Sequence, residues 1–194
     1  DDNVLVQGVL GSPYAVGFFG YAYYAENADT LKVLGIEGVV PTEETVESFT
    51  YPLARPLFVY STADIMAEKP QVAAFIAYYL TIVNDEIESV GYFPASNEAL
   101  NGARQAWLDA MGMGLIALPA VDPLAVTGDV LTAGSSTVAP LSERIAERFR
   151  DDGYAGNITI DVIGSGAGFE RFCVNAETDI ANASRPIKDR ELEA

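Results

Sequence analysis

The amino-acid sequence predicts a single α/β domain built as a three-layer sandwich, with a mainly parallel sheet of about five strands and helices on both faces. Three observations predict this class. Strand-like segments alternate with polar loops and helix-like segments three times after residue 128. A nearly continuous apolar run at residues 56–61 is typical of a strand covered on both faces. The 194 residues are also enough for one well-packed core.

The first quarter of the chain is rich in glycine, valine and aromatic residues, and its predicted elements are short. They are a strand at 4–9, a turn at 11–13, a helix within 18–25, a strand at 31–36, and a loop over 38–54 that holds one helical turn between Thr42 and Ser48. The apolar run at 56–61 follows this section directly.

Two long helices are predicted in the middle of the chain. Pro70 opens the first, and its apolar residues recur at helical spacing as far as Val83. Ser96 is a suitable N-cap for the second helix, whose apolar stripe ends at Gly112 or Gly114.

Residues 112–128 interrupt the pattern, because they hold glycines at both ends, two prolines and a single charged residue. We interpret this stretch as a linker or an apolar strap across a surface. A new α/β unit then begins, and its expected elements are a strand at 129–133, a helix at 140–150, a strand at 158–163, a helix at 167–174 and a strand at 179–183.

The charge of the chain restricts the partners that it can bind. It carries 28 acidic and 11 basic residues, for a net charge of -17. Nucleic acids and anionic membrane surfaces attract clustered lysine and arginine, so both are excluded as partners. The same charge repels small anions at long range. Any anion site must therefore be local, built from backbone N–H groups, hydroxyls and one arginine.

The residue inventory also restricts the chemistry. The chain has no histidine, and its single Cys173 cannot form an internal disulfide. We therefore expect no metal centre, no cofactor and no histidine-based catalysis. The sequence opens without a basic leader segment, and its longest apolar stretch near the middle is too short to span a bilayer.

Three polar loops follow the three predicted strands of the last third, at 133–138, 163–168 and 182–186. Ligands of open parallel sheets bind outside the carboxyl ends of the strands. Helix N-termini, serine and threonine hydroxyls and Arg185 supply suitable donors for an anion there. Each loop alone has a simpler explanation: a helix cap, an incomplete dinucleotide fingerprint, or a surface ion pair at Arg185. The prediction of an anion pocket depends on all three loops together.

Longer motifs carry a specific resemblance. The segments TAGSSTVAPLSERIAERF, ITIDVIGSGAGFERFC and TDIANASRPI resemble the amino-terminal part of substrate-binding proteins of phosphate ABC transporters, which belong to the two-lobed periplasmic binding protein superfamily. The segments QGVLGSPYAVGFFGYAYYAENADTLKVLGI and YPLARPLFVYSTADI, with the two helices that follow, are similar to the carboxyl-terminal part of the same proteins. The resemblance covers nearly the whole chain outside 112–128. It implies one α/β lobe and inorganic phosphate as the ligand.

The resemblance also implies site residues in the first two loops. Thr137, together with the N–H group of Val138, matches the phosphate donors of the family's first loop. Ser165 matches the serine of the second loop, and Ser136 and Gly166 are further candidates.

The third loop departs from part of the family. Ser184 and Arg185 fall where some relatives have an aspartate that accepts the proton of bound phosphate, so the separation of phosphate from sulfate is open. The donors that the family places on its second lobe have no counterpart in this chain. Cys173 resembles a cysteine that pairs with a downstream cysteine in relatives, and no such partner exists here.

The order of the two sections is the reverse of the family order. In the family, the chain leaves the first lobe, builds the second lobe and returns to complete the first. Here the returning section, 1–111, precedes the starting section, 129–194, and 112–128 joins them. We interpret the chain as a circularly permuted single lobe of engineered origin, which is feasible because domain termini often lie close together.

These observations favour a phosphate-binding lobe with half a site and weak or no binding. The alternative is a structural scaffold or self-associating domain without a ligand, with a homodimer through the exposed cleft face. An enzyme is not expected, because no serine has a basic neighbour placed to activate it. The parent family further implies an ABC permease as partner and a periplasmic or extracellular location.

Overall fold

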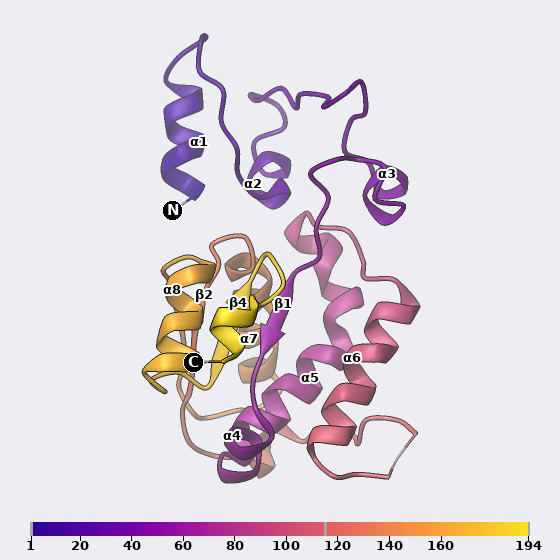
Figure 1. Ribbon diagram of the computed structural model, residues 1–194, viewed down its shortest axis with the longest axis vertical. Coiled ribbons are helices and arrows are strands. Elements are labelled where there is room, and N and C mark those ends of the chain that lie inside the picture. The colour runs from indigo at the N-terminus through magenta and orange to yellow at the C-terminus, as the bar shows by residue number, and fades with distance from the viewer. Residues whose placement is uncertain (1, 115, 194) are drawn as a thin grey trace.

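The computed structural model describes residues 2–114 and 116–193. Its described residues form a four-stranded sheet in the order β1-β4-β2-β3 (Figure 1). The central strand β2 (Val130–Gly134) runs parallel to β3 (Ile158–Val162) on one side and to β4 (Ile180–Ala183) on the other. Strand β1 (Phe58–Tyr60) pairs antiparallel with β4 at the edge. The α/β class and the mainly parallel sheet are thereby confirmed.

Helices cover both faces of this sheet. On one face α5 (Pro70–Glu86) and α7 (Ala139–Asp151) enclose the main core, and Phe75 and Phe149 are among its fully buried rings. On the other face α8 (Ser165–Phe169) places Phe169 against alanines of β4. Parallel strands buried on both faces are expected to be continuously apolar, as β2 and β4 largely are.

The two predicted long helices are present with the predicted starts. Pro70 is the first residue of α5, and α6 (Asn97–Ala110) begins after Ser96, whose hydroxyl oxygen accepts a hydrogen bond from the Ala99 N–H at 3.2 Å. The indole of Trp107 on α6 donates to the Ala73 carbonyl of α5 at 3.1 Å. Two short helices flank this pair, α4 (Ala63–Glu68) and the 3-10 helix η1 (Ile87–Val90).

The helix predicted at 167–174 has a different form. It begins earlier, at Ser165, and continues beyond α8 as a π-helical turn, η3 (Glu170–Val174). The chain ends in a single helical turn, α9 (Asp189–Leu192). Residues 112–114 and 116–128, which belong to the predicted linker, are irregular apart from the 3-10 turn η2 (Pro123–Ala125), which Asp122 caps.

Two predictions for the first section are wrong. Residues 4–9 are helical, within α1 (Asp2–Leu10), because burial recurs every four residues at Asp2 and Val6 rather than every two. Residues 31–36 form only an isolated bridge between Ile36 and Val39 around a tight turn, so the described sheet has four strands rather than about five.

The remaining elements of the first section are short. The predicted helix within 18–25 is reduced to α2 (Tyr21–Ala25), and the predicted turn is α3 (Glu43–Glu47), capped by Thr42. Figure 1 shows residues 2–54 above the sheet, with β1 leading from them into it. Strand β1 is half-buried rather than covered on both faces, because it lies at the sheet edge. In the described ranges no helix has the length and apolar character needed to cross a membrane.

Candidate oxyanion site

The three polar loops leave the sheet at the same edge, because the strands that precede them are parallel. Two sets of hydrogen bonds join the loops. The Gly134 carbonyl accepts from the N–H groups of Ile163 at 3.0 Å and Gly164 at 2.7 Å, which joins the first loop to the second. The Ser165 hydroxyl oxygen accepts from the Ser184 N–H at 3.2 Å, which joins the second loop to the third.

Glycine is required where these loops approach one another. A Cβ atom on Gly134 would lie 2.0 Å from the Asn182 carbonyl oxygen, and one on Gly168 would lie 2.6 Å from the Cα of Gly134. Gly134 also has a φ of +144°, which L side chains rarely adopt. By contrast, a Cβ on Gly166 would meet nothing within 4 Å, so the start of α8 is open to solvent.

In the first loop the backbone donors are largely used internally. The Thr137 N–H donates to the Ser135 hydroxyl at 3.2 Å, and the Val138 N–H donates to the Ser135 carbonyl at 3.2 Å. Val138 is buried, whereas Thr137 is half-buried. Among the described residues, the Thr137 hydroxyl has no hydrogen-bond partner, so it is free to bind a ligand.

Residues of the first section, together with Tyr92 from the segment before α6, hold this loop by hydrogen bonds. Tyr23 donates to the Ser136 carbonyl at 2.9 Å, and Tyr92 donates to the Thr137 carbonyl at 2.7 Å. The buried carboxylate of Asp2 accepts from the Ser136 hydroxyl at 2.8 Å and from the Gly20 N–H at 3.1 Å. The predicted candidate Ser136 is therefore already bound to a carboxylate.

The two tyrosines are fixed as donors by their surroundings. Burial, followed by the nearby carboxylate of Asp2, raises the pKa of Tyr23 to about 12, and burial raises the pKa of Tyr92 further still. Both rings therefore stay protonated, and able to donate, at alkaline pH values where an exposed tyrosine ionises. Sequence reasoning missed Asp2, Tyr23 and Tyr92, and the aromatic cluster around residues 18–24 was the only signal of such a role.

In the third loop, Arg185 is bound within the chain. Its guanidinium forms a two-point contact with Glu191, at 2.6 Å and 2.8 Å, and lies 5.1 Å from the ring centroid of Phe169. Hydrogen bonding from Arg185 lowers the pKa of Glu191 to about 2. The two guanidinium N–H donors of Arg185 that the sequence predicts for an anion are thus bound to the Glu191 carboxylate.

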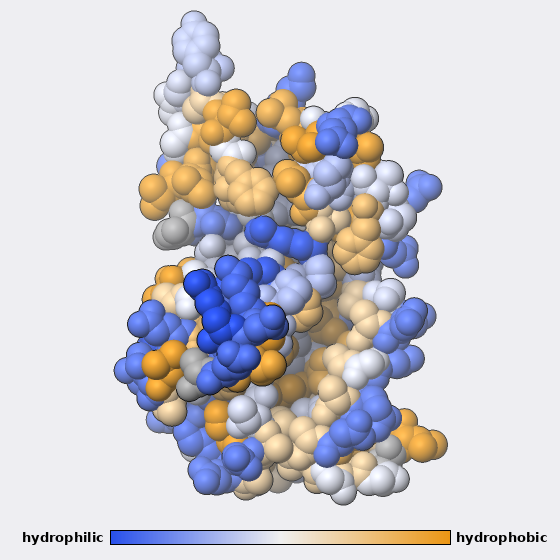
Figure 2. All heavy atoms as spheres, in the orientation of Figure 1, coloured by the Kyte–Doolittle hydropathy of each residue, from blue (hydrophilic) through white to orange (hydrophobic). Residues whose placement is uncertain are grey.

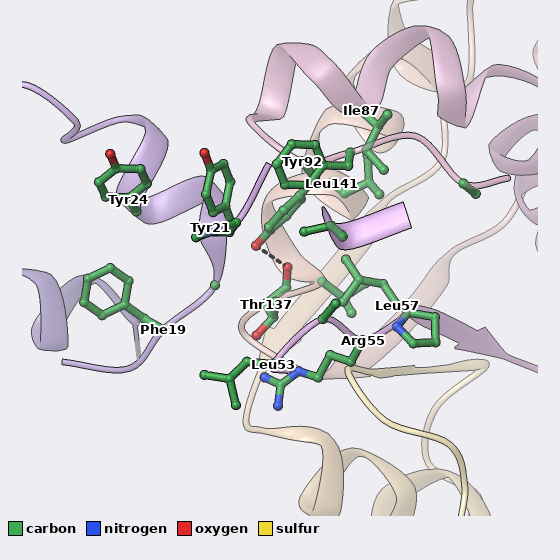
Figure 3. A pocket seen from close by; sticks show the side chains of 18 of the residues that line it. Phe19, Tyr21, Tyr24, Leu53, Arg55, Leu57, Ile87, Tyr92, Thr137 and Leu141 are labelled. Atoms are coloured by element: carbon green, nitrogen blue, oxygen red, sulfur yellow. Dashed lines mark hydrogen bonds between the residues drawn. The ribbon is translucent and has the colours of Figure 1, made fainter. Parts of the chain in front are cut away.

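A groove of about 1550 Å³ adjoins the first loop (Figure 3). It lies between the first section on one side and α5 and α6 on the other, and Thr137 and Leu141 line it from the loop and α7. Figure 3 shows Phe19, Tyr21 and Leu53 among its mainly apolar walls, with Arg55 as a charged exception.

Metal ligands and the single thiol also bear on the chemistry of the described residues. Over residues 2–114 and 116–193, no group of three or more Cys, Asp or Glu side chains is arranged to hold a metal ion. Cys173 is a free thiol whose pKa burial raises, so the reactive thiolate is disfavoured.

Comparison with known proteins finds relatives for about half of the chain. No family model matches the chain. Protein SphX of Synechocystis sp. is 41% identical over 106 residues, which are 52% of this chain and 32% of that protein. The phosphate-binding protein PstS of Staphylococcus aureus (strain USA300) is 31% identical over 100 residues, which are 49% of this chain and 31% of that protein. The matched stretches span about a third of these relatives.

A solved structure has the same fold. The phosphate-binding protein of a phosphate ABC transporter from Streptococcus pneumoniae TIGR4 superposes with a TM-score of 0.64 at 21% identity, over 97% of this chain and 64% of that one. PstS and the S. pneumoniae protein are named as binding proteins rather than enzymes. Over about half of its length, the chain is therefore homologous to SphX and PstS, and it has the fold of a phosphate-transporter binding protein.

Proposed function

We propose that this chain is a lobe that binds an oxyanion, and that its ligand is inorganic phosphate. The observation that carries the proposal is the convergence of three hydroxyl-bearing loops at the carboxyl edge of three adjacent parallel strands. Homology to phosphate-binding proteins supports phosphate as the anion.

The proposed donors are hydroxyl and backbone groups. Thr137 has a free hydroxyl, and Ser165 accepts from the Ser184 N–H, which leaves its own O–H group free to donate. The open position of Gly166 lets a ligand approach the first N–H groups of α8. Val138 and Ser184 shape the loops around these donors, since their own N–H groups are already bonded.

Weak binding follows from the number of donors. We propose that the chain is a permuted single lobe of engineered origin, with 1–111 and 129–194 as the two reversed sections, and that it lacks the donors of a second lobe. Charge-assisted hydrogen bonds contribute roughly 1.5–3 kcal/mol each. Because about 1.4 kcal/mol corresponds to tenfold in Kd, losing several donors leaves a constant on the order of millimolar. Within this proposal, the parent protein works outside the cytoplasm with an ABC permease.

A scaffold or self-associating domain is the second candidate. The observation that favours it is the apolar surface of the first section, where Val16 is 78% exposed and Val4 is 67% exposed. Orange patches at the top of Figure 2 show this surface. In sedimentation experiments this candidate predicts that the fraction of dimer increases with salt concentration, because salt screens the repulsion between chains of net charge -17. A monomer at all salt concentrations would exclude it.

Titration with inorganic phosphate, followed by backbone amide NMR, tests the phosphate proposal. Amides in residues 134–138 and 164–168 should shift first. Thr137→Ala and Ser165→Ala should each raise the Kd on the order of tenfold, since each removes one hydrogen bond to a charged ligand. Ser89→Ala, which removes an exposed hydroxyl on η1, is the control and should leave the Kd unchanged. Amide shifts spread evenly over the surface would contradict the proposal.

A further inference from the structure

Five of the eleven lysines and arginines of the chain form ion pairs with carboxylates among the described residues. The ion pairs join Lys69 to Asp179, Arg144 and Arg148 to Glu86, Arg171 to Asp161 and Glu177, and Arg185 to Glu191. Arg55 differs from these residues. Among the described residues its guanidinium has no carboxylate partner, and its one contact is with the ring of Phe18, 5.4 Å from the centroid.

The position of Arg55 connects it to the first loop. It is exposed, and it belongs to the segment that leads from the first section into β1. It lines the same groove as Thr137, the residue whose hydroxyl is free. In Figure 3 the Arg55 guanidinium and the Thr137 side chain point toward one another, beside Leu53. One unpaired cation and one unpaired hydroxyl donor therefore face the same part of the groove.

We propose that Arg55, rather than Arg185, is the positively charged contact of the bound oxyanion. This inference rests on the proposed function and adds a residue to that site. A guanidinium offers two parallel N–H donors that match two oxygens of a tetrahedral anion. The ring of Phe18 holds the cation while leaving its N–H edge free, since a cation over a ring face does not use its hydrogen bonds. Arg185 lacks this freedom because Glu191 occupies its fork.

A cation at the groove would also offset the repulsion between this acidic chain and an anion. A net charge of -17 repels phosphate at long range, and neutral hydroxyls alone give it little compensation. One unpaired arginine at the groove supplies that compensation locally. The groove also contains the carboxylates of Glu43 and Glu47 and a second cation, Lys32. Arg55 is the favoured contact because its guanidinium points toward Thr137 (Figure 3).

The test is the Kd for inorganic phosphate, measured by amide NMR at fixed ionic strength. Arg55→Met should raise the Kd on the order of tenfold, and Arg55→Lys should have a smaller effect because it keeps the charge and loses the fork. Lys32→Met removes an equal charge from another residue that lines the groove, and it should change the Kd less than about twofold. The double variant Arg185→Met with Glu191→Gln should also leave the Kd nearly unchanged.

The outcomes separate this inference from the proposed function. If Thr137→Ala weakens binding while Arg55→Met does not, the role of Arg55 is overturned and the phosphate site stands. If Lys32→Met and Arg55→Met weaken binding equally, the effect is one of net charge, which also overturns a direct contact. If the unaltered chain shows no phosphate-dependent shifts at all, the proposed function fails and the inference fails with it.

Discussion

Two regions of the molecule bury their apolar residues to very different extents. One is the sheet with the helices that cover it, called the α/β half below, and the other is the first section. Strands β2 and β4 are nearly fully buried between helices, and their loops are joined by backbone hydrogen bonds. Residues 2–54 expose Val4, Tyr14, Val16, Phe18 and Phe49 to between 58% and 93%. The apolar atoms of the first section appear as orange patches at the top of Figure 2. The same kinds of side chain thus make a core in one region and an open surface in the other.

This difference separates stability from ligand contacts. The α/β half supplies the rigid loops, while the first section supplies Tyr23 and Asp2 around them, and the segment after it supplies Arg55. Substitutions in the two regions should therefore have unequal effects, and each of the following changes is a way to test that inequality.

The largest effect is expected in the core. Phe149→Ala removes a ring that is 0% exposed, and it should lower the free energy of unfolding by about 3–5 kcal/mol. Phe49→Ala, at a ring that is 64% exposed, should change it by less than about 0.5 kcal/mol. Urea unfolding followed by Trp107 fluorescence measures both. Similar losses in the two variants would show that the first section is packed as tightly as the core.

A smaller effect is expected at the loop glycines. Gly134→Ala would force a Cβ against the Asn182 carbonyl at a positive φ, and it should lower the free energy of unfolding by at least about 2 kcal/mol. Gly166→Ala meets no neighbouring atom within 4 Å, so it should be neutral or stabilising, by up to about 1 kcal/mol. Thermal denaturation compares the pair, and a stable Gly134→Ala protein would mean that the loops do not approach as closely as described.

The smallest expected effect is on the stability of the fold at low pH. The pKa of Glu191 is lowered to about 2 in the folded chain, below the ordinary value of about 4.3 in an unfolded chain. Its contact with Arg185 therefore stabilises the fold fully above about pH 4.3, and this contribution is lost as the pH falls toward about 2.

Glu191→Gln should reduce this acid-dependent loss. Urea midpoints of the two proteins, compared between about pH 5 and about pH 2.5, should fall less steeply in the variant. Parallel curves would show that the contact between Arg185 and Glu191 does not persist in solution.

The fold of the α/β half could be predicted from sequence because its local signals agree with its packing. Pro70 and Ser96 mark helix starts that the structure retains, and the strands after residue 128 alternate with helices as parallel sheets require. The strand predicted at 4–9 is wrong because the local sequence pattern and the packing disagree there. Its alternating valines suit a strand, but among the described residues no neighbouring strand pairs with it, and helical burial of Asp2 and Val6 prevails.

The candidate site could be predicted only in part. The loops that contain Thr137, Ser165 and Ser184 have local sequence signals, and the parallel sheet brings their parent strands to one edge. Whether an arginine is free or paired has no such signal, because it depends on which carboxylate folds against it. The sequence therefore favours Arg185 and overlooks Arg55, and only the contacts of Glu191 and Phe18 distinguish them.

Calorimetric titration of the unaltered chain with inorganic phosphate tests the central claim most directly. A half-site of hydroxyls, helix N–H groups and one arginine predicts a Kd on the order of millimolar. Binding should also weaken at lower salt, because the net charge of -17 is then less screened. A micromolar or tighter Kd would contradict the half-site and mean that a second chain completes the pocket.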